Sequence, residues 1–281
     1  MKILITGARG MLARDLLRTL RGHELRGVTR EDMDVTNSVV VSTVMNAWRP
    51  QVVIHCAAMT AVDQCESDQD AAWRANVIGS ANIAVACQRI GARIIALSTD
   101  YVFSGAGLEP YHEWSVPAPR TVYGQSKLAG EEAIRRHCAD HLILRVAWLY
   151  GPGGPSFVHT MERLLRQSGD AIAVVDDQIG NPTSTAVVSQ LIALLIEQAA
   201  VGTIHGTCNG ETSWYGFAQE IARLNSLPRV LRPCTTAEFP RPAPRPANSR
   251  LEKRALRLLN LPQPPDWRDA LAHFIQEFPN G

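Results

Sequence analysis

The chain has 281 residues, of which 46% are hydrophobic, and a formal net charge of +1 at pH 7. This length and composition are typical of one large α/β domain, with or without a smaller lobe, that buries a substantial core. The net charge is close to zero and no long basic run occurs. We therefore expect this protein to bind neither nucleic acid nor an anionic membrane.

The six cysteines are scattered, with no Cys-x2-Cys pair and no spacing typical of metal ligands. We therefore expect no metal site, and we expect reduced thiols, as in the cytoplasm. The first apolar run, Ile3–Ile5, is too short for a signal peptide. No segment approaches the ~20 apolar residues of a membrane span, so a cytoplasmic protein is expected.

A glycine turn follows the first predicted strand, Lys2–Thr6, and leads into an amphipathic helix over Leu12–Leu20. Strand, glycine turn and helix in this order are the context that a dinucleotide-binding fingerprint requires. Gly7 would allow the tight turn, and Gly10 would let the backbone approach a pyrophosphate at the helix N-terminus. Ala13 takes the third position of the fingerprint, where alanine is accepted. A purely structural turn is the alternative.

The end of the second strand predicts which nicotinamide cofactor is bound. An acid there would hold a ribose 2′-hydroxyl, whereas an arginine accommodates a 2′-phosphate. The sequence has Arg30, which favours NADPH, with NADH as the alternative because Glu31 and Asp32 follow directly. Asp34 and Val35 are expected at the adenine edge of the site.

Strands and helices alternate through the first half of the chain. The strands are expected over Lys2–Thr6, Glu24–Val28, Pro50–His55, Arg93–Ser98 and His141–Val146, and the helices over Leu12–Leu20, Val39–Trp48, Asp68–Ile90 and Val122–His137. This order indicates an α/β fold, namely a Rossmann-type doubly wound parallel sheet with helices on both faces. Small residues after the third strand, Ala57 and Ala58 before Met59, would let a flat ligand lie against the backbone.

After residue 150 the pattern changes to short elements, which predicts a smaller C-terminal substrate-binding lobe. Domain 1–150 would be the NAD(P)-binding Rossmann domain, joined by a helix at 184–200, and 151–281 would be mostly the substrate lobe. Further elements are expected over Phe157–Gln167, Ala171–Val175, Trp214–Leu224 and Trp267–Phe278. The proline-rich Pro240–Pro246 cannot form a regular helix, and we expect it to be an ordered wall of a substrate pocket.

Tyr123 and Lys127 are four residues apart in the helix expected over Val122–His137, so their side chains leave one face a single turn apart. An ammonium beside a phenol favours the phenolate, and we therefore expect Lys127 to lower the pKa of Tyr123 from about 10. Such a tyrosine can exchange a proton with a substrate. A solvated helix with an unrelated Tyr and Lys is the alternative.

Taken together, these motifs resemble the extended short-chain dehydrogenase/reductase superfamily, and most closely its dTDP-4-dehydrorhamnose reductase branch. The resemblance runs nearly end to end. The residues that carry it are Gly7-x2-Gly10, Ala57-Ala58-x-Thr60-Ala61-Val62-Asp63-x2-Glu66, Ser98-Thr99-Asp100-Tyr101-Val102-Phe103-x-Gly105, Val122-Tyr123-Gly124-x2-Lys127-Leu128-Ala129-Gly130-Glu131, Arg145-x2-Trp148 and Arg245-Pro246-x-Asn248-Ser249.

The resemblance implies a set of catalytic residues. Tyr123 would protonate the sugar oxygen, while Lys127 lowers its pKa and hydrogen-bonds the nicotinamide ribose. Thr99 would orient the carbonyl group, and Asp100 would be an accessory polar group, although it could simply cap a turn.

Binding residues follow from the same resemblance and the glycine turn. Val62, Tyr101 and Trp148 match positions that line the sugar pocket, although Trp148 could be plain core. Met59 departs from the family, which commonly has His or Tyr there. The expected cofactor-binding residues are Gly7, Gly10, Met11, Leu12, Arg30, Asp34, Val35, Ala57, Ala58, Met59, Tyr123 and Lys127.

The implied reaction is the NADPH-dependent reduction of the C4 keto group of a nucleotide-linked 4-keto-6-deoxy sugar, giving dTDP-L-rhamnose for polysaccharide biosynthesis. Related 4,6-dehydratases carry a Glu where this chain has Tyr101, so water elimination is not expected. Two alternatives stay open: another nucleotide 4-keto-6-deoxy sugar as substrate, and a non-catalytic NADP-binding regulatory subunit of the methionine adenosyltransferase type. The partner is expected to be a small-molecule nucleotide sugar, with a homodimer as a possible assembly.

Overall fold

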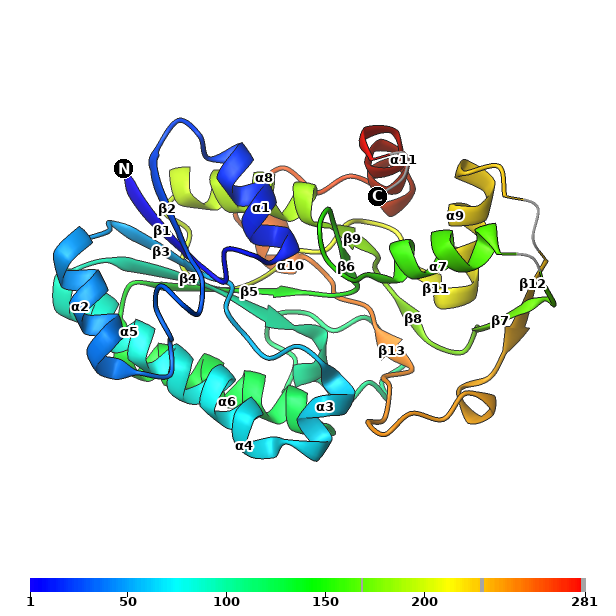
Figure 1. The fold of residues 1–281 in the computed structure, drawn as a ribbon, viewed down its shortest axis with the longest axis horizontal. Coiled ribbons are helices and arrows are strands. Elements are labelled where there is room, and N and C mark those ends of the chain that lie inside the picture. Colours follow the sequence, from blue (N-terminus) through cyan, green and yellow to red (C-terminus); the bar gives the residue numbers. More distant parts are fainter. Residues whose placement is uncertain (168, 228–229, 279–281) are drawn as a thin grey trace.

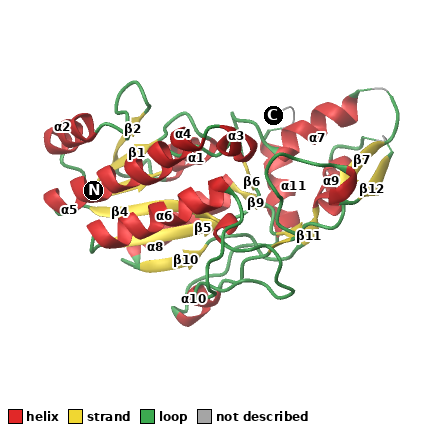
Figure 2. Cartoon of the chain, turned by 90° about the horizontal axis from the view of Figure 1, so that it is seen from below, coloured by secondary structure: helices red, strands yellow, loops and turns green. Residues whose placement is uncertain are grey.

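The computed structural model describes residues 1–167, 169–227 and 230–278. Its central sheet has six strands, all parallel, in the order β10-β5-β4-β3-β1-β2 (Figure 1; β10 is labelled in Figure 2). The strands are β1 Lys2–Thr6, β2 Glu24–Val28, β3 Val52–His55, β4 Arg93–Thr99, β5 His141–Val146 and β10 Gly202–His205. The predicted doubly wound α/β fold is confirmed. Its edge strand β10 is an addition that the sequence pattern did not predict.

Helices cover both faces of the sheet because side chains alternate along each buried strand. Ile3 and Ile5 pack in one core cluster with α1 and α8, whereas Leu4 packs in the other with α2, α5 and α6. The bounds of these helices are α1 Met11–Thr19, α8 Thr185–Glu197, α2 Ser38–Trp48, α5 Gly79–Ile90 and α6 Val122–His137. The two apolar layers fix the sheet and leave its carboxyl edge for a ligand.

The helix predicted over Asp68–Ile90 is not one regular helix. It consists of α4 Gln69–Trp73, a π-helical turn over Arg74–Ile78, and α5. The shorter α3, Val62–Ser67, precedes it. A π-helical turn is widened by one residue, and such turns are frequent at functional sites. Here the turn carries the buried Asn76 toward the neighbouring loop.

A second body of short elements lies beyond the carboxyl ends of the strands (Figure 2). Its helices are α7 Phe157–Arg166, α9 Trp214–Leu224 and α11 Trp267–Glu277, and its short strands are β6 Leu149–Tyr150, β7 Ile172–Val175, β8 Ile179–Gly180, β9 Thr183–Ser184, β11 Thr212–Ser213, β12 Leu231–Cys234 and β13 Asn248–Ser249. The three helices, together with β6, β7 and β12, share a separate core cluster that includes Tyr150, Phe217 and Trp267.

We keep the division into domains 1–150 and 151–281 as a proposal. The separate core of the second body supports it. Three later elements nevertheless pack with the first body: α8 and β10 contribute to the first core cluster, as does α10, Arg254–Leu258. The first domain would therefore include α8, β10 and α10 from the C-terminal half, and not only the predicted helix at 184–200. Among the described residues, no helix is long and apolar enough to cross a membrane.

Candidate active site

The glycine turn after β1 lies against the end of β3. Gly7 has φ of +69°, and a Cβ there would lie 2.9 Å from the backbone nitrogen of Ala57, so the position requires glycine. The Thr6 hydroxyl accepts a hydrogen bond from that same nitrogen at 3.0 Å. The turn is thus fixed to the neighbouring loop, as a backbone cradle for a pyrophosphate requires.

The N-terminus of α1 opens directly from this turn. Gly10 caps the helix without a side-chain hydrogen bond, so the first backbone N–H groups have no side-chain acceptor at the cap. Met11 lines the cavity described below, whereas the Leu12 side chain packs in the core. Unsatisfied N–H groups and the helix dipole together favour a bound anion here.

The segment after β2 leaves Arg30 open to solvent. Its side chain is 85% exposed, and its Nε lies 3.5 Å from a carboxylate oxygen of Asp34. The two acids that follow it already have partners. Glu31 pairs with Arg9 at 2.9 Å, and Asp32 accepts hydrogen bonds from the backbone and hydroxyl of Thr29. Arg30 is therefore available for a 2′-phosphate.

Asn76 in the π-helical turn holds the loop after β3. Its side-chain oxygen accepts from the Met59 backbone nitrogen at 2.9 Å, and its amide donates to the Met59 carbonyl at 3.1 Å. The same amide donates to the Ser126 hydroxyl on α6 at 3.0 Å. The loop that carries Ala57, Ala58 and Met59 is thereby tied to the helix of Tyr123.

Tyr123 stands in the first turn of α6, which Thr121 caps by accepting from the Gly124 backbone nitrogen at 3.0 Å. The Tyr123 side chain is buried, and its ring meets the ring of Tyr101 edge-on at 5.4 Å. Burial raises the pKa of Tyr123, and the Thr99 hydroxyl opposes this increase. The direction is opposite to the expected one, because loss of solvation dominates and the charge of Asp100 acts in the same direction.

Lys127 is buried one turn further along α6. Its ammonium donates to the carbonyl oxygen of Leu97 on β4 at 2.7 Å. Burial lowers the pKa of Lys127 to about 8, against an increase caused mainly by Glu131. The ammonium is thus directed to the end of β4, and it does not overcome the effect of burial on the pKa of Tyr123.

Thr99 and Asp100 follow at the end of β4. The Thr99 hydroxyl donates to Asp100 Oδ1 at 3.1 Å and accepts from the Tyr101 backbone nitrogen at 3.2 Å. Burial raises the pKa of Asp100 to about 6, against the hydroxyls of Ser249 and Thr99. Its Oδ2 has no hydrogen-bond partner within the described part of the chain. Asp100 therefore caps no helix with that oxygen and can offer it to a ligand.

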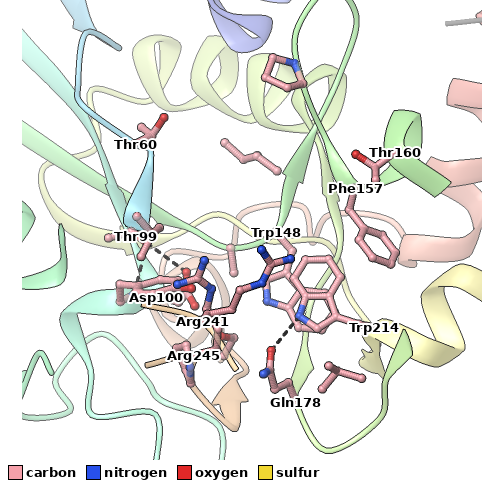
Figure 3. Close-up of a pocket in the computed structure, with 18 of the residues that line it drawn as sticks. Thr60, Thr99, Asp100, Trp148, Phe157, Thr160, Gln178, Trp214, Arg241 and Arg245 are labelled. Atoms are coloured by element: carbon pink, nitrogen blue, oxygen red, sulfur yellow. Dashed lines mark hydrogen bonds between the residues drawn. The ribbon is translucent and has the colours of Figure 1, made fainter. Parts of the chain in front are cut away.

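A cavity of about 640 Å³ joins these groups to the second body (Figure 3). Residues predicted for catalysis or sugar binding that line it are Val62, Thr99, Asp100, Tyr101, Tyr123 and Trp148. Met11 opens onto the same cavity from the cofactor side. Apart from Met11 and Tyr123, the predicted cofactor residues do not line this cavity; they follow β1, β2 and β3 or lie on α1 and α6. The sequence thus predicted a set of residues that the fold brings to one edge of the sheet.

Trp148 does not stand alone in the cavity wall. It lies stacked on Trp214 with ring centroids 3.5 Å apart and planes 10° apart, and Trp214 donates to Gln178 at 3.1 Å (Figure 3). Trp214, Gln178 and Phe157 line the cavity and were not predicted. The sequence signal for Trp214 is weak, because a tryptophan at the start of an amphipathic helix is equally typical of core packing.

The proline-rich segment forms part of the cavity wall, as predicted. Arg245 is held by Asp63 through two hydrogen bonds of 2.9 and 2.7 Å, and Asp63 also accepts from the Ala243 backbone. Arg241 lines the cavity with its guanidinium 4.6 Å from the Phe239 ring centroid. The segment therefore supplies one anchored and one solvent-facing cation.

Metal ligands do not gather at this site. Among the described residues, no group of three or more His, Cys, Asp or Glu side chains could hold a metal ion. All six cysteines are unpaired. The buried His55 is bonded to the hydroxyls of Thr6 and Ser80, which accounts for both of its ring nitrogens.

Comparison with known proteins gives one consistent picture. Residues 1–280 match the family model described as "RmlD substrate binding domain". A dTDP-4-dehydrorhamnose reductase of Streptomyces griseus is 42% identical over 277 residues, which are 95% of this chain and 91% of that protein. Two solved dTDP-4-dehydrorhamnose reductases superpose closely. The Clostridium acetobutylicum structure has a TM-score of 0.97 at 42% identity, covering 99% and 100% of the two chains. The Bacillus anthracis structure, in complex with NADP, has a TM-score of 0.96 at 39% identity, covering 98% and 99%.

Proposed function

The chain belongs to the RmlD substrate-binding-domain family. From this premise we propose which of its residues bind the cofactor, bind the substrate and transfer the proton. The protein is an oxidoreductase of dTDP-rhamnose biosynthesis that uses NADPH, with NADH as a possible substitute, to reduce the C4 keto group of dTDP-4-dehydro-L-rhamnose. Two relatives that superpose closely on it are dTDP-4-dehydrorhamnose reductases, and one of them is in complex with NADP.

The residues around β1 and α1 fit the cofactor. Gly7 leaves space that a Cβ would fill, and the open N-terminus of α1 suits the pyrophosphate. We assign cofactor binding to Gly7, Gly10, Met11, Leu12, Arg30, Asp34, Val35, Ala57, Ala58, Met59, Tyr123 and Lys127. When bound, NADPH supplies the hydride that reduces C4 of the sugar.

Tyr123 donates the proton that completes the reduction. As C4 gains a hydride, its oxygen takes the phenolic proton of Tyr123 and becomes a hydroxyl. The raised pKa of Tyr123 keeps the phenol protonated before the reaction, which is the state that a general acid needs. Thr99, whose hydroxyl interacts with Tyr123, orients the carbonyl oxygen. Lys127 stabilises the phenolate that remains after proton transfer.

Water elimination does not fit the same cavity. A dehydratase needs a carboxylate base where this chain has Tyr101. Burial raises the pKa of Tyr101, so the phenol is neutral and cannot serve as that base. Its ring instead forms a wall beside Tyr123, and Asp100 offers its unpaired oxygen to a sugar hydroxyl.

Two further groups would hold the substrate, one at its diphosphate and one at its sugar. Arg241 is exposed and lines the cavity, so its guanidinium can pair with a diphosphate. The Trp148 and Trp214 stack offers a flat apolar face against which a sugar ring can lie. Binding of the remote nucleotide would then fix C4 beside Tyr123.

One observation carries this assignment: Tyr123, Thr99 and Met11 open onto a single cavity, so proton donor, carbonyl partner and cofactor turn meet in one place. The test is the loss of NADPH absorbance when purified protein meets dTDP-4-dehydro-L-rhamnose. We expect stoichiometric oxidation of NADPH, and no product from dTDP-glucose with or without NAD. Formation of a 4-keto-6-deoxy product from dTDP-glucose would contradict the assignment. No reaction with either substrate would favour a regulatory subunit.

We also propose a cytoplasmic location, which the six unpaired cysteines support because thiols persist in a reducing compartment. We propose a homodimer as the assembly. Sedimentation analysis of the purified chain would test it.

A further inference from the structure

Glu131 lies one helical turn beyond Lys127 on α6, and only 2% of it is exposed. Its carboxylate accepts four hydrogen bonds. Oε1 accepts from the Ser98 hydroxyl at 2.5 Å and from Arg145 Nε at 2.9 Å. Oε2 accepts from Arg145 Nη2 at 2.7 Å and from Arg135 Nη2 at 2.8 Å. A buried carboxylate with all its acceptor positions filled is held in one orientation.

The two inner partners come from adjacent strands. Ser98 on β4 is the direct neighbour of Arg145 on β5 in the sheet register. Arg145 is also 2% exposed, and its guanidinium lies 5.1 Å from the centroid of the Phe103 ring. Glu131 therefore joins α6 to two strands at their carboxyl ends, whereas Arg135 approaches from the exposed side of the same helix.

This junction adjoins Thr99, the proposed partner of the carbonyl group, and the hydrogen bond of Lys127. Ser98 directly precedes Thr99, and the residue before it, Leu97, accepts the hydrogen bond of Lys127. Two bonds in opposite directions thus tie α6 to the end of β4: Lys127 donates to the strand, and Ser98 donates to Glu131. A shift of Glu131 would move α6 relative to Thr99.

Glu131 is also the buried anion that faces Lys127. From the β3 side, His55 and Cys56 face the ammonium, and both are neutral: burial lowers the pKa of His55 to about 3 and raises that of Cys56 to about 12. Arg145 and Arg135 share the same carboxylate from the other side. Glu131 is the largest influence that opposes the lowering of the Lys127 pKa by burial.

We infer that Glu131, clamped by Ser98 and Arg145, is a positioning residue that holds Tyr123 and Lys127 in register with Thr99 and supplies the countercharge of the Lys127 ammonium. The inference rests on the proposed function, in which Tyr123 and Lys127 act together. It assigns to the Glu131 junction a part in catalysis as well as in stability.

The test compares Glu131→Gln and Ser98→Ala with the control Arg135→Met. The control also removes a hydrogen bond to Glu131, but from the exposed side and without touching β4. We expect both test variants to lower kcat roughly 10-fold to 100-fold, because small misplacements of reacting groups are costly. In Glu131→Gln the basic limb of the kcat/KM profile should fall by about one pH unit, since loss of a nearby anion makes Lys127 easier to deprotonate. Arg135→Met should keep kcat within about twofold.

A purely structural junction would give a different pattern. Glu131→Gln and Ser98→Ala would then lower Tm but leave kcat and the pH profile of the folded protein unchanged, and this result would overturn the inference. If Glu131→Gln does not fold, kcat of Ser98→Ala is the deciding measurement. Ser98→Ala removes only one hydroxyl group, so it should still fold. An inactive wild type would overturn the proposed function as well, whereas an active wild type with fully active variants overturns this inference only.

Discussion

Gly124 lies against the carbonyl oxygen of Tyr101 so closely that a Cβ at residue 124 would be 2.2 Å from that oxygen. The contact joins the first turn of α6 to the turn that follows β4. Because Tyr123 is the neighbour of Gly124, the approach of the two backbones sets the distance between the proposed proton donor and Thr99.

Gly124→Ala should therefore damage the site more than a usual helix substitution. Alanine favours a helix by about 1 kcal/mol over glycine, but here the methyl group must push α6 away from the Tyr101 carbonyl. We expect a fall in both Tm and kcat, measured by thermal unfolding and by NADPH oxidation. Gly91→Ser, at the left-handed end of α5 with no atoms within 4 Å of an added Cβ, is the control; it should lower Tm alone.

Arg30→Ala should reduce the preference for NADPH. A charge-assisted phosphate contact contributes about 1–3 kcal/mol, so the ratio of kcat/KM for NADPH to that for NADH should fall by roughly 5-fold to 150-fold. Arg89→Ala, an exposed arginine in the last turn of α5, is the matched control. An unchanged ratio in Arg30→Ala would mean that Arg30 does not contact the 2′-phosphate.

Trp214→Ala should raise KM for the nucleotide sugar because Trp148 loses the ring on which it is stacked. Stacked aromatic pairs contribute about 0.5–1.5 kcal/mol beyond the area that they bury, which corresponds to roughly 2-fold to 12-fold in KM. Trp114→Ala serves as the control, since Trp114 is 59% exposed and does not line the cavity. Equal KM values in the two variants would remove Trp214 from substrate binding.

Asp100 should make the protein less stable as the pH rises from about 4 to 6. Burial raises its pKa to about 6 in the folded state, so the folded protein binds more protons than the unfolded chain in this window. The free energy of unfolding of the wild type, relative to that of Asp100→Asn, should therefore fall by about 2–3 kcal/mol across it. Chemical denaturation at several pH values measures this difference. A constant difference would show that Asp100 titrates normally.

Much of the fold follows from pattern alone. Four of the five predicted strands are nearly continuous buried runs, which are typical of a parallel sheet covered on both faces, whereas β2 at the sheet edge is mostly exposed. Strand β10 was missed because it has four residues and ends in His205, which gives no periodicity to detect. The π-helical turn was missed for a different reason: the tight approach of Asn76 to Gly130, where a Cβ would lie 2.4 Å from the Asn76 carbonyl, is a tertiary contact.

For the site, spacing predicted which residues meet but not their electrostatics. The four-residue interval between Tyr123 and Lys127 places both on one face of a helix, yet it carries no information on burial. Burial raises the pKa of Tyr123. The Lys127 ammonium donates its hydrogen bond to the carbonyl of Leu97, which lies on β4. Trp214 joins Trp148 only because the second body folds back over the sheet edge, which local sequence cannot show.

The central claim is that Tyr123 donates the proton to the sugar oxygen, and kcat of Tyr123→Phe tests it most directly. Phenylalanine keeps the ring but removes the acid, so kcat should fall by roughly 10²-fold to 10⁴-fold. Tyr215→Phe on α9, a residue that does not line the cavity, is the control for loss of a phenol. The Kd of NADPH for Tyr123→Phe, measured by titration calorimetry, should stay within about threefold of wild type. This result would show that the cofactor site is intact. A Phe variant with intact NADPH binding and a kcat within about threefold of wild type would contradict the account.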